Sequence, residues 1–357
     1  MVGYLAFTNY LADNIIAFFD QYQHPTQFAN TVEPEPEKSK GLLSALPTFF
    51  DNETIPDILL KSAEYQKAAV IASDVNSVYV EEPIDALVNI FCTFTTNNSI
   101  RTTTGTGFFV HSDGVIMTNA HVAQYLLLET TDLLGEADCL IRQGNPAVAE
   151  YRAELLYIPP AWVQKNASVI DAEIPTGTGE RDYALLYVSE SISNTPLPAR
   201  FPALELDTEL LPHSTKDMRV TAAGYPATDL IKNGSGTSLI PRQAETSISE
   251  LYTFTSNYAD VFSIRGSAVG AEGSSGGPIV NQDGKVIGMI ATRGNDSVDG
   301  VGSLRAISVS HIHRTILEET GFSLSRNISG NLPYRSQVFR QTLSPFLITL
   351  LETELKN

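Results

Sequence analysis

The sequence contains little cysteine and few basic residues. Its 357 residues include two Cys, and 23 Lys and Arg stand against 41 Asp and Glu, for a formal net charge of −18. Two cysteines are too few for a disulfide framework or a cysteine-rich zinc site. An acidic chain also lacks the basic surface that nucleic acids and anionic membranes require, so we predict no nucleic-acid partner. Cys92 and Cys139 could form one bridge, but we expect buried free thiols.

Long apolar runs are also missing. None approaches the roughly 20 residues that a membrane-spanning helix needs, so we predict no integral membrane segment. No Lys or Arg precedes Lys38, so the N-terminus lacks the positive region of a secretory signal. Either the protein remains in the compartment where it is made, or this chain begins after a removed leader. The sequence does not separate the two.

The remaining composition is that of a folded protein with an acidic flank. Hydrophobic residues make up 43% of the chain, which argues against disorder. Residues 1–84 are the most acidic part, with 12 acidic and 4 basic residues. Within them, Tyr10–Tyr22 and Ile55–Ala72 have helix-like apolar spacing. We predict that residues 1–84 form an acidic helical extension that either packs on the main domain or stays partly mobile.

Residues 85–310 carry the pattern of many short strands. Runs rich in β-branched and aromatic residues are separated by Gly, Asn and Asp. Asp113-Gly114 and Asp283-Gly284 each predict a tight hairpin turn, because Gly readily adopts positive φ. Such a pattern predicts a sandwich or a barrel. The predicted strands include Leu87–Thr95, Thr106–Val110, Val115–Thr118, Tyr183–Val188, Arg219–Ala223, Val261–Ile264, Pro278–Val280 and Val286–Thr292.

Three other segments have weaker patterns. Glu150–Glu180 contains three prolines and predicts a long loop or insertion. His311–Thr320 predicts a helix that is capped by Ser310 and stopped by Gly321. Ser344–Leu351 predicts a last short helix.

The string Glu272–Pro278 contains two serines between glycines. A serine hydroxyl is a weak nucleophile, so a catalytic serine needs a base and a pocket that stabilises an anion. His121 lies just after one predicted strand, and Asp182 lies at the start of another. An imidazole can act as the base, and a carboxylate can orient the imidazole. All three groups are therefore present, in the chain order His, Asp, Ser.

Several short motifs accompany these groups in a characteristic order. They are Gly105–Val110, Asp113-Gly114, Thr118–Val122, Ala223–Pro226, Gly273–Pro278, Asp283-Gly284 and Val286–Gly288. With these motifs the chain resembles a trypsin-like serine protease, most closely the HtrA/Deg type. The resemblance covers residues 85–316. It implies a mainly β chymotrypsin fold of two six-stranded antiparallel barrels, at about 85–195 and 200–310. The N-terminal helical extension is not accounted for by the resemblance; it and a C-terminal helix are predicted from the local patterns.

The resemblance implies roles for the three groups. Ser275 corresponds to the nucleophile, His121 to the general base that later acts as an acid, and Asp182 to the carboxylate that orients His121. Asp171 is the alternative carboxylate, because a long insertion precedes Asp182. The strand that follows Asp182 at once favours Asp182.

The resemblance also implies an oxyanion hole and a substrate pocket. The backbone amides of Gly273, Ser275 and Ser274 correspond to the oxyanion hole. In trypsin-like proteases an acid six residues before the nucleophile selects Arg or Lys, and here that position is Val269. We therefore expect cleavage after small or medium aliphatic residues. The predicted pocket residues are Val269, Ile290, Ala291 and Thr292.

The chain departs from the family pattern at two points. Ser274 stands where secreted trypsins carry an aspartate that pairs with a freed N-terminus, so we expect no such zymogen switch. Only 41 residues, 317–357, follow Ile316, and we interpret them as a C-terminal tail. This tail is too short for the PDZ domain that is usual in HtrA proteases.

Two other functions remain as alternatives. The Gly-x-Ser-x-Gly pattern would also fit an α/β-hydrolase esterase, but that fold needs a helix after the serine. A non-catalytic binding module on the protease fold is the second alternative. The leading prediction is a serine endopeptidase with polypeptide substrates, no cofactor and no metal. A homo-oligomer is one of the assembly states that the sequence leaves open. His311-x-His313 we interpret as a helix start rather than a metal site.

Overall fold

The computed structural model describes residues 59–70, 77–95, 100–129, 131, 136–172, 179–228, 238–254 and 258–355. The helix predicted at Tyr10–Tyr22 lies outside these residues. Of the predicted helix Ile55–Ala72, the described part contains α3 (Ala63–Val70).

The first half of the chain forms a closed barrel. Its strand order is β1-β2-β3-β6-β5-β4, and neighbouring strands run antiparallel. The strands are β1 (Leu87–Thr95), β2 (Ile100–His111), β3 (Val115–Thr118), β4 (Glu136–Gln143), β5 (Val148–Tyr157) and β6 (Ala184–Ser191). Buried apolar side chains fill its interior, and this core continues under the C-terminal helices. We call this unit barrel one.

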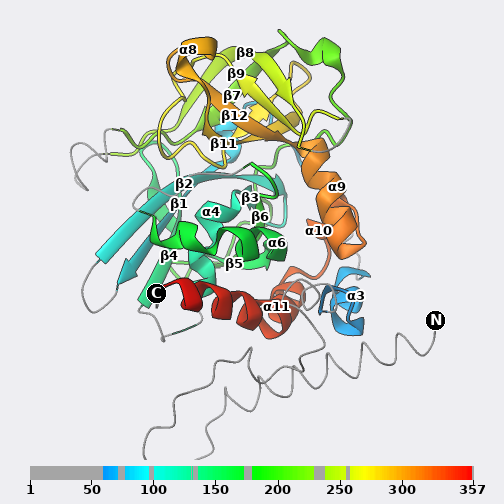
Figure 1. The fold of residues 1–357 in the computed structure, drawn as a ribbon. Coiled ribbons are helices and arrows are strands. Elements are labelled where there is room, and N and C mark those ends of the chain that lie inside the picture. Colours follow the sequence, from blue (N-terminus) through cyan, green and yellow to red (C-terminus); the bar gives the residue numbers. More distant parts are fainter. Residues whose placement is uncertain are drawn as a thin grey trace, which may run out of the picture.

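The second half forms another closed barrel, which lies above barrel one in Figure 1. Its order is β10-β11-β12-β9-β8-β7, again antiparallel. The strands are β7 (Arg219–Gly224), β8 (Arg242–Tyr252), β9 (Val261–Ile264), β10 (Pro278–Val280), β11 (Val286–Arg293) and β12 (Leu304–Ser308). A separate apolar cluster fills this barrel two. The prediction of two six-stranded barrels is therefore confirmed.

The two Asp-Gly turns form as predicted. Gly114 and Gly284 have φ of +84° and +78°, a region that side-chain-bearing residues rarely adopt. A Cβ on Gly114 would also lie 2.8 Å from the ring of Phe201. Both the backbone conformation and the space at this turn therefore require glycine.

The prediction of a long loop at Glu150–Glu180 was wrong. Most of it is β5, the helix α6 (Pro160–Asn166) and the 3-10 turn η3 (Ala167–Asp171). In β5, Tyr151, Ala153 and Leu155 are buried and alternate with charged residues that are partly exposed. The strand was not predicted because charged residues on its outer face interrupt the apolar residues of its inner face. The strands β4, β8 and β12 were also missed, and β4 and β8 likewise carry several charged residues.

The C-terminal residues form a layer of helices. The helix predicted at His311–Thr320 is α9 (Val309–Thr320), and its cap is Ser308 rather than Ser310. Gly321 ends it with φ of +78°. The short helix expected at Ser344–Leu351 is part of α11 (Leu332–Leu355), which has 24 residues. Pro345 lies inside this helix. Proline disfavours a helix interior, but the length and packing of α11 stabilise the helix in spite of it.

The expectation of free thiols was wrong. Cys92 on β1 and Cys139 on β4 form a disulfide, with a Cα–Cα separation of 4.0 Å. The register of β1 and β4 places the two residues directly opposite each other. Cross-strand register is not readable from a sequence separation of 47 residues, so the sequence could not decide the pairing.

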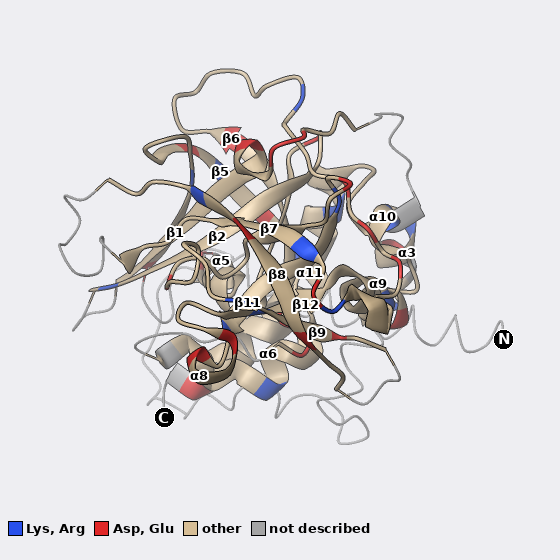
Figure 2. Ribbon diagram, turned by 90° about the horizontal axis from the view of Figure 1, so that it is seen from above, with Lys and Arg blue, Asp and Glu red and all other residues tan. Residues whose placement is uncertain are grey.

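The helices pack mainly on barrel one. Figure 1 shows α11 beneath barrel one, with α3 at one end of it, and α9 and α10 (Leu324–Asn327) along one side. Figure 2 shows Lys and Arg scattered over several elements, often beside acidic residues. In the described part of the chain, no helix is both long and apolar enough to cross a bilayer. The remaining short helices are η2 (Pro83–Ala86), α4 (Ala120–Ala123), α5 (Tyr125–Leu128), η4 (His213–Thr215) and α8 (Asp296–Asp299).

Candidate active site

His121 and Asp182 lie together because β3 and β6 are neighbours. Register pairs Thr118, the last residue of β3, with Ala184, the first residue of β6. The chain turns into α4 just after β3, and His121 is its second residue. One residue, Tyr183, separates Asp182 from the start of β6. The two residues therefore meet at the end of this strand pair.

The carboxylate of Asp182 holds the histidine at two points. It accepts hydrogen bonds from the backbone N–H of His121 at 2.9 Å and from the ring Nδ1 at 2.8 Å. Asp182 is fully buried and His121 is 3% exposed. In the neutral imidazole, donation from Nδ1 to the carboxylate leaves the lone pair of Nε2 free. Among the described side chains, the carboxylate that contacts His121 is that of Asp182.

Ser275 lies in the loop before β10, between two glycines of positive φ. Gly273 has φ of +90° and Gly276 has φ of +89°. Ser275 is partly exposed, and its hydroxyl donates to the carbonyl of Ala291 at 3.4 Å. Among the hydrogen bonds of the described residues, none joins Ser275 to His121. Strand β10 follows the serine, where an α/β-hydrolase would have a helix.

Thr106 of β2 fastens the serine loop to barrel one. Its N–H donates to the carbonyl of Ser275 at 2.8 Å, and its hydroxyl donates to the carbonyl of Gly273 at 2.7 Å. The same hydroxyl accepts the N–H of Tyr225 at 2.9 Å. The Thr106 carbonyl accepts the Thr118 hydroxyl at 2.7 Å, three residues before His121. Thr106 thus connects the serine loop to the strand that leads to the histidine.

From the sequence, Thr106 was predicted only as the start of a strand and as part of the Gly105–Val110 motif, with no role in the site. Its role in the site is set by partners far away in the chain, Gly273 being 167 residues distant. The signal that could have found it is the hydroxyl between the two glycines of Gly105–Gly107. A Cβ on Gly105 would lie 2.6 Å from Val122, and one on Gly107 would lie 2.8 Å from Ile116, so the chain on both sides of Thr106 is closely packed.

We expect Thr106→Val to lower the rate of reaction at Ser275. Valine has the same shape but lacks the hydroxyl, so the carbonyl of Gly273 and the N–H of Tyr225 each lose a partner. Two buried groups without partners cost about 2–6 kcal/mol of stability together, and the loop is freed to shift. Urea unfolding and the rate of labelling by a fluorophosphonate measure the two effects. Thr106→Ser, which keeps the hydroxyl, should retain most of both; equal losses in the two variants would contradict the role of the hydroxyl.

The loop amides differ in what they bind. The N–H of Ser274 donates to the carbonyl of Ala271 at 3.3 Å, and that of Gly276 donates to the carbonyl of Ile290 at 2.8 Å. Within the described chain, the N–H groups of Gly273 and Ser275 donate to no other group. Of the three amides expected in an oxyanion hole, those of Gly273 and Ser275 are therefore available and that of Ser274 is already engaged.

Comparison with known proteins shows the family of the chain. A family model described as a trypsin-like peptidase domain matches residues 105–289, which is just over half of the chain. The chain belongs to the trypsin-like peptidase family. It is a serine-type peptidase with the chymotrypsin fold.

Two crystal structures of the peptidase Rv3671c from M. tuberculosis are similar to this trypsin-like peptidase. The active form has 17% sequence identity and a TM-score of 0.39, and the match covers 82% of this chain and 96% of that chain. An inactive form has 16% identity and a TM-score of 0.39, and the match covers 70% and 98%. No curated protein matches the sequence significantly.

The predicted pocket residues of the peptidase lie in different surroundings. Val269 and Ile290 are buried in the apolar cluster of barrel two. Ala291 is also buried, and its carbonyl accepts the Ser275 hydroxyl. Thr292 is partly exposed. The position six residues before Ser275 therefore holds an apolar side chain that is part of the core.

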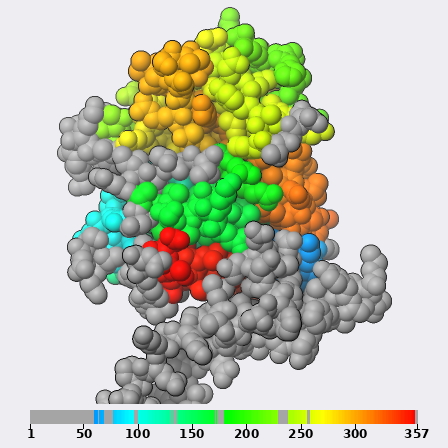
Figure 3. Space-filling model, in the orientation of Figure 1, coloured from blue at the N-terminus to red at the C-terminus, as the bar shows by residue number. Residues whose placement is uncertain are grey.

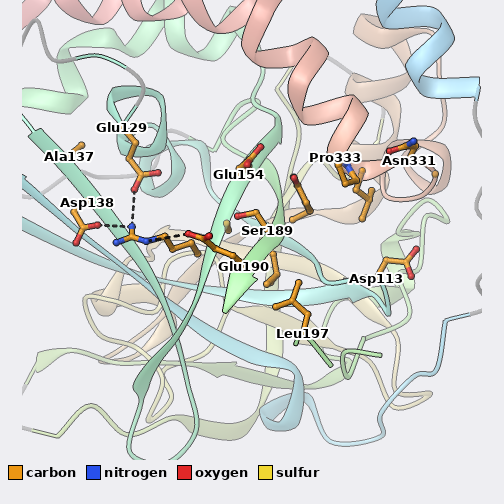
Figure 4. Close-up of a pocket in the computed structure, with 16 residues that line it drawn as sticks. Asp113, Glu129, Ala137, Asp138, Glu154, Ser189, Glu190, Leu197, Asn331 and Pro333 are labelled. Atoms are coloured by element: carbon orange, nitrogen blue, oxygen red, sulfur yellow. Dashed lines mark hydrogen bonds and ion pairs between the residues drawn. The ribbon is translucent and has the colours of Figure 1, made fainter. Parts of the chain in front are cut away.

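A cavity of about 780 Å³ lies elsewhere, on the outer wall of barrel one near the start of α11 (Figure 4). Arg152 lines this cavity and forms ion pairs with Asp138 at 2.7 Å, Glu190 at 3.8 Å and Glu129 at 4.0 Å. Burial raises the pKa of Glu129 to about 7. The lining includes none of the residues of the Ser275 site, so this cavity is separate from the candidate active site.

Proposed function

We propose that this peptidase is an endopeptidase that forms an acyl-enzyme on Ser275, with His121 as general base and Asp182 as its orienting carboxylate. The observation that carries the proposal is the buried double contact between His121 and Asp182. It fixes the ring so that Nε2 is the free acceptor. Burying a carboxylate without a partner costs free energy, and the contacts with His121 offset that cost for Asp182.

The proposed reaction begins with a rotation of the Ser275 side chain. Its hydroxyl leaves the weak 3.4 Å contact with Ala291 and donates to His121 Nε2. Nε2 takes the proton as the oxygen attacks the carbonyl carbon of the substrate. The negative charge that develops on the carbonyl oxygen is stabilised by the N–H groups of Gly273 and Ser275.

The acyl-enzyme then forms and is hydrolysed. The imidazolium of His121 returns its proton to the leaving amine, the C–N bond breaks, and the carbonyl stays bonded to Ser275. A water molecule gives a proton to Nε2 and attacks the carbonyl carbon of the ester. The C–O bond to Ser275 then breaks, and His121 returns the proton to the serine oxygen, which releases the acid and restores the serine. No step requires a cofactor.

A fluorophosphonate tests this proposal directly. The probe phosphonylates a serine only when a base and an oxyanion pocket activate that serine. We expect labelling of the full chain, with the adduct on Ser275 by peptide mass mapping. Labelling strongly reduced in His121→Ala would support the base. A folded protein that takes no label would favour the non-catalytic binding module.

We also propose a preference for small or medium aliphatic residues before the cleaved bond. The proposal is supported by the apolar Val269 where an acid would select Arg or Lys, and by the apolar neighbours Ile290 and Ala291. An apolar pocket leaves a charged side chain without a partner, which is costly. Digestion of a peptide library, with cleavage sites read by mass spectrometry, should show Ala, Val or Leu in this position. Dominant cleavage after Lys, Arg or Asp would contradict it.

A further inference from the structure

Helix α9 is anchored in barrel two at its N-terminal end. It follows β12 directly, and its cap Ser308 donates its N–H to the carbonyl of Asp260 at 2.9 Å. The carboxylate of Asp260, which is 1% exposed, contacts His311 at 3.0 Å and Arg314 at 2.5 Å. Figure 1 shows α9 running from barrel two down the side of barrel one, and Figure 3 shows the orange surface of this region along that side.

The C-terminal end of α9 contacts Arg181, the residue before Asp182. The guanidinium of Arg181 forms ion pairs with Glu319 and, at 3.4 Å, with Glu318. Glu319 is nearly buried, and its other oxygen accepts the hydroxyl of the fully buried Tyr157 at the end of β5. Arg181 has φ of +56°, a conformation that costs free energy in a residue with a large side chain. The contacts with α9 help to hold this backbone in place.

The same helix contacts Tyr183, the residue after Asp182. The Tyr183 hydroxyl lies 2.9 Å from that of Thr315, and both side chains are buried. Thr315 donates its one hydroxyl proton to the carbonyl of His311 at 2.9 Å. Tyr183 is therefore the donor to Thr315. Tyr183 also donates its N–H to the carbonyl of Arg181 at 2.9 Å, which closes a tight turn around Asp182.

The carboxylate of Asp182 depends on this turn for its direction. Among the described residues, both hydrogen bonds to the carboxylate come from His121. The one other anchor is on the backbone, where the Asp182 carbonyl accepts the side-chain amide of Asn119 at 2.9 Å. A rotation of the 181–183 turn would therefore carry the carboxylate away from Nδ1 with no third group to resist it.

We propose that α9 is a clamp that aims the carboxylate of Asp182 at His121, with Arg181, Tyr183, Thr315 and Glu319 as its positioning residues. Glu319 holds Arg181, and Thr315 holds Tyr183, so the acid is fixed from both sides. Because α9 is rooted in barrel two at Asp260, it also fixes the acid of barrel one relative to the serine loop of barrel two. This inference rests on the proposed function, in which Asp182 orients the general base.

The test uses the full-length chain and two substitutions. Each removes the hydrogen bond between Tyr183 and Thr315, one by changing Tyr183 and the other by changing Thr315. Tyr183→Phe and Thr315→Val each delete one hydroxyl with little change of shape. We expect each to lower kcat about 10–100-fold, the size of effect that a shift of about 1 Å has on catalysis, while KM changes less than about twofold. The low-field proton resonance of the Nδ1–H to carboxylate hydrogen bond should broaden or disappear in both variants.

The double variant and two further substitutions separate positioning from general stability. Tyr183→Phe with Thr315→Val should lose no more kcat than either single variant, because both delete the same contact. Thr315→Ser should restore kcat, because it keeps the hydroxyl. Leu317→Ala, on the exposed side of α9, should leave kcat and the proton resonance unchanged.

Two results would overturn the clamp. The first is a wild-type kcat and an unchanged proton resonance in the folded Tyr183→Phe and Thr315→Val variants. The second is a loss of kcat in Leu317→Ala that equals theirs. Failure of the proposed function looks different, because then the wild-type chain itself takes no fluorophosphonate label. If a variant unfolds, kcat and the proton resonance are measured in Glu319→Gln instead, which weakens the contact between Glu319 and Arg181.

Discussion

Ser275→Ala should abolish peptide hydrolysis. The substitution removes the oxygen that forms the acyl-enzyme and leaves the loop glycines Gly273 and Gly276 in place. In serine proteases, loss of the nucleophile costs about 10⁶-fold in kcat, and the remaining rate comes from binding and the oxyanion hole. We expect a decrease of that order, with KM nearly unchanged. Hydrolysis of a fluorogenic peptide, followed over hours at high enzyme concentration, measures it.

The matched control is the neighbouring serine. Ser274 is fully buried, and its hydroxyl donates to the carbonyl of Val269 at 2.6 Å. Ser274→Ala should therefore reduce stability by about 1 kcal/mol and still take a fluorophosphonate label at Ser275. If labelling were lost in Ser274→Ala and kept in Ser275→Ala, the nucleophile would be Ser274, and the proposal would be contradicted.

Asp182→Asn should lower kcat about 10⁴-fold at neutral pH. The amide oxygen of asparagine can still accept the backbone N–H of His121, so the fold of this turn is retained. The amide nitrogen, however, donates to Nδ1, which forces the ring proton onto Nε2. In that tautomer Nε2 has no lone pair for the serine proton. The rate of labelling and kcat should fall together.

The comparison with Asp171→Asn decides between the two candidate acids. Asp171 ends the turn η3, 11 residues before Asp182 in the sequence. We expect the Asp171 variant to keep a kcat within a few fold of the wild type. A large loss in Asp171→Asn together with a small one in Asp182→Asn would show that the structural contact with His121 is not the catalytic one.

Local sequence patterns predicted the strands and turns that carry their own signal. β1, β3, β9 and β10 have the predicted bounds, because each is a short apolar run next to turn-forming residues. β4, β5 and β8 were missed because charged residues occupy much of each strand. In a barrel the outward face of a strand meets solvent or helices, so a strand need not be apolar throughout.

The sequence by itself determined the chemical groups of the site and the class of fold. The glycines around Ser275, the strand before His121 and the strand after Asp182 are local features that any chain with this sequence must carry.

The tertiary structure decided which of these groups meet. The contact between His121 and Asp182 spans 61 residues, that between Tyr183 and Thr315 spans 132, and that between Thr106 and Gly273 spans 167. Pairing of Cys92 with Cys139 likewise depends on the register of two strands. Contacts of this kind form only when barrels close and helices dock. Their partners are chosen by packing and register, which no local pattern contains.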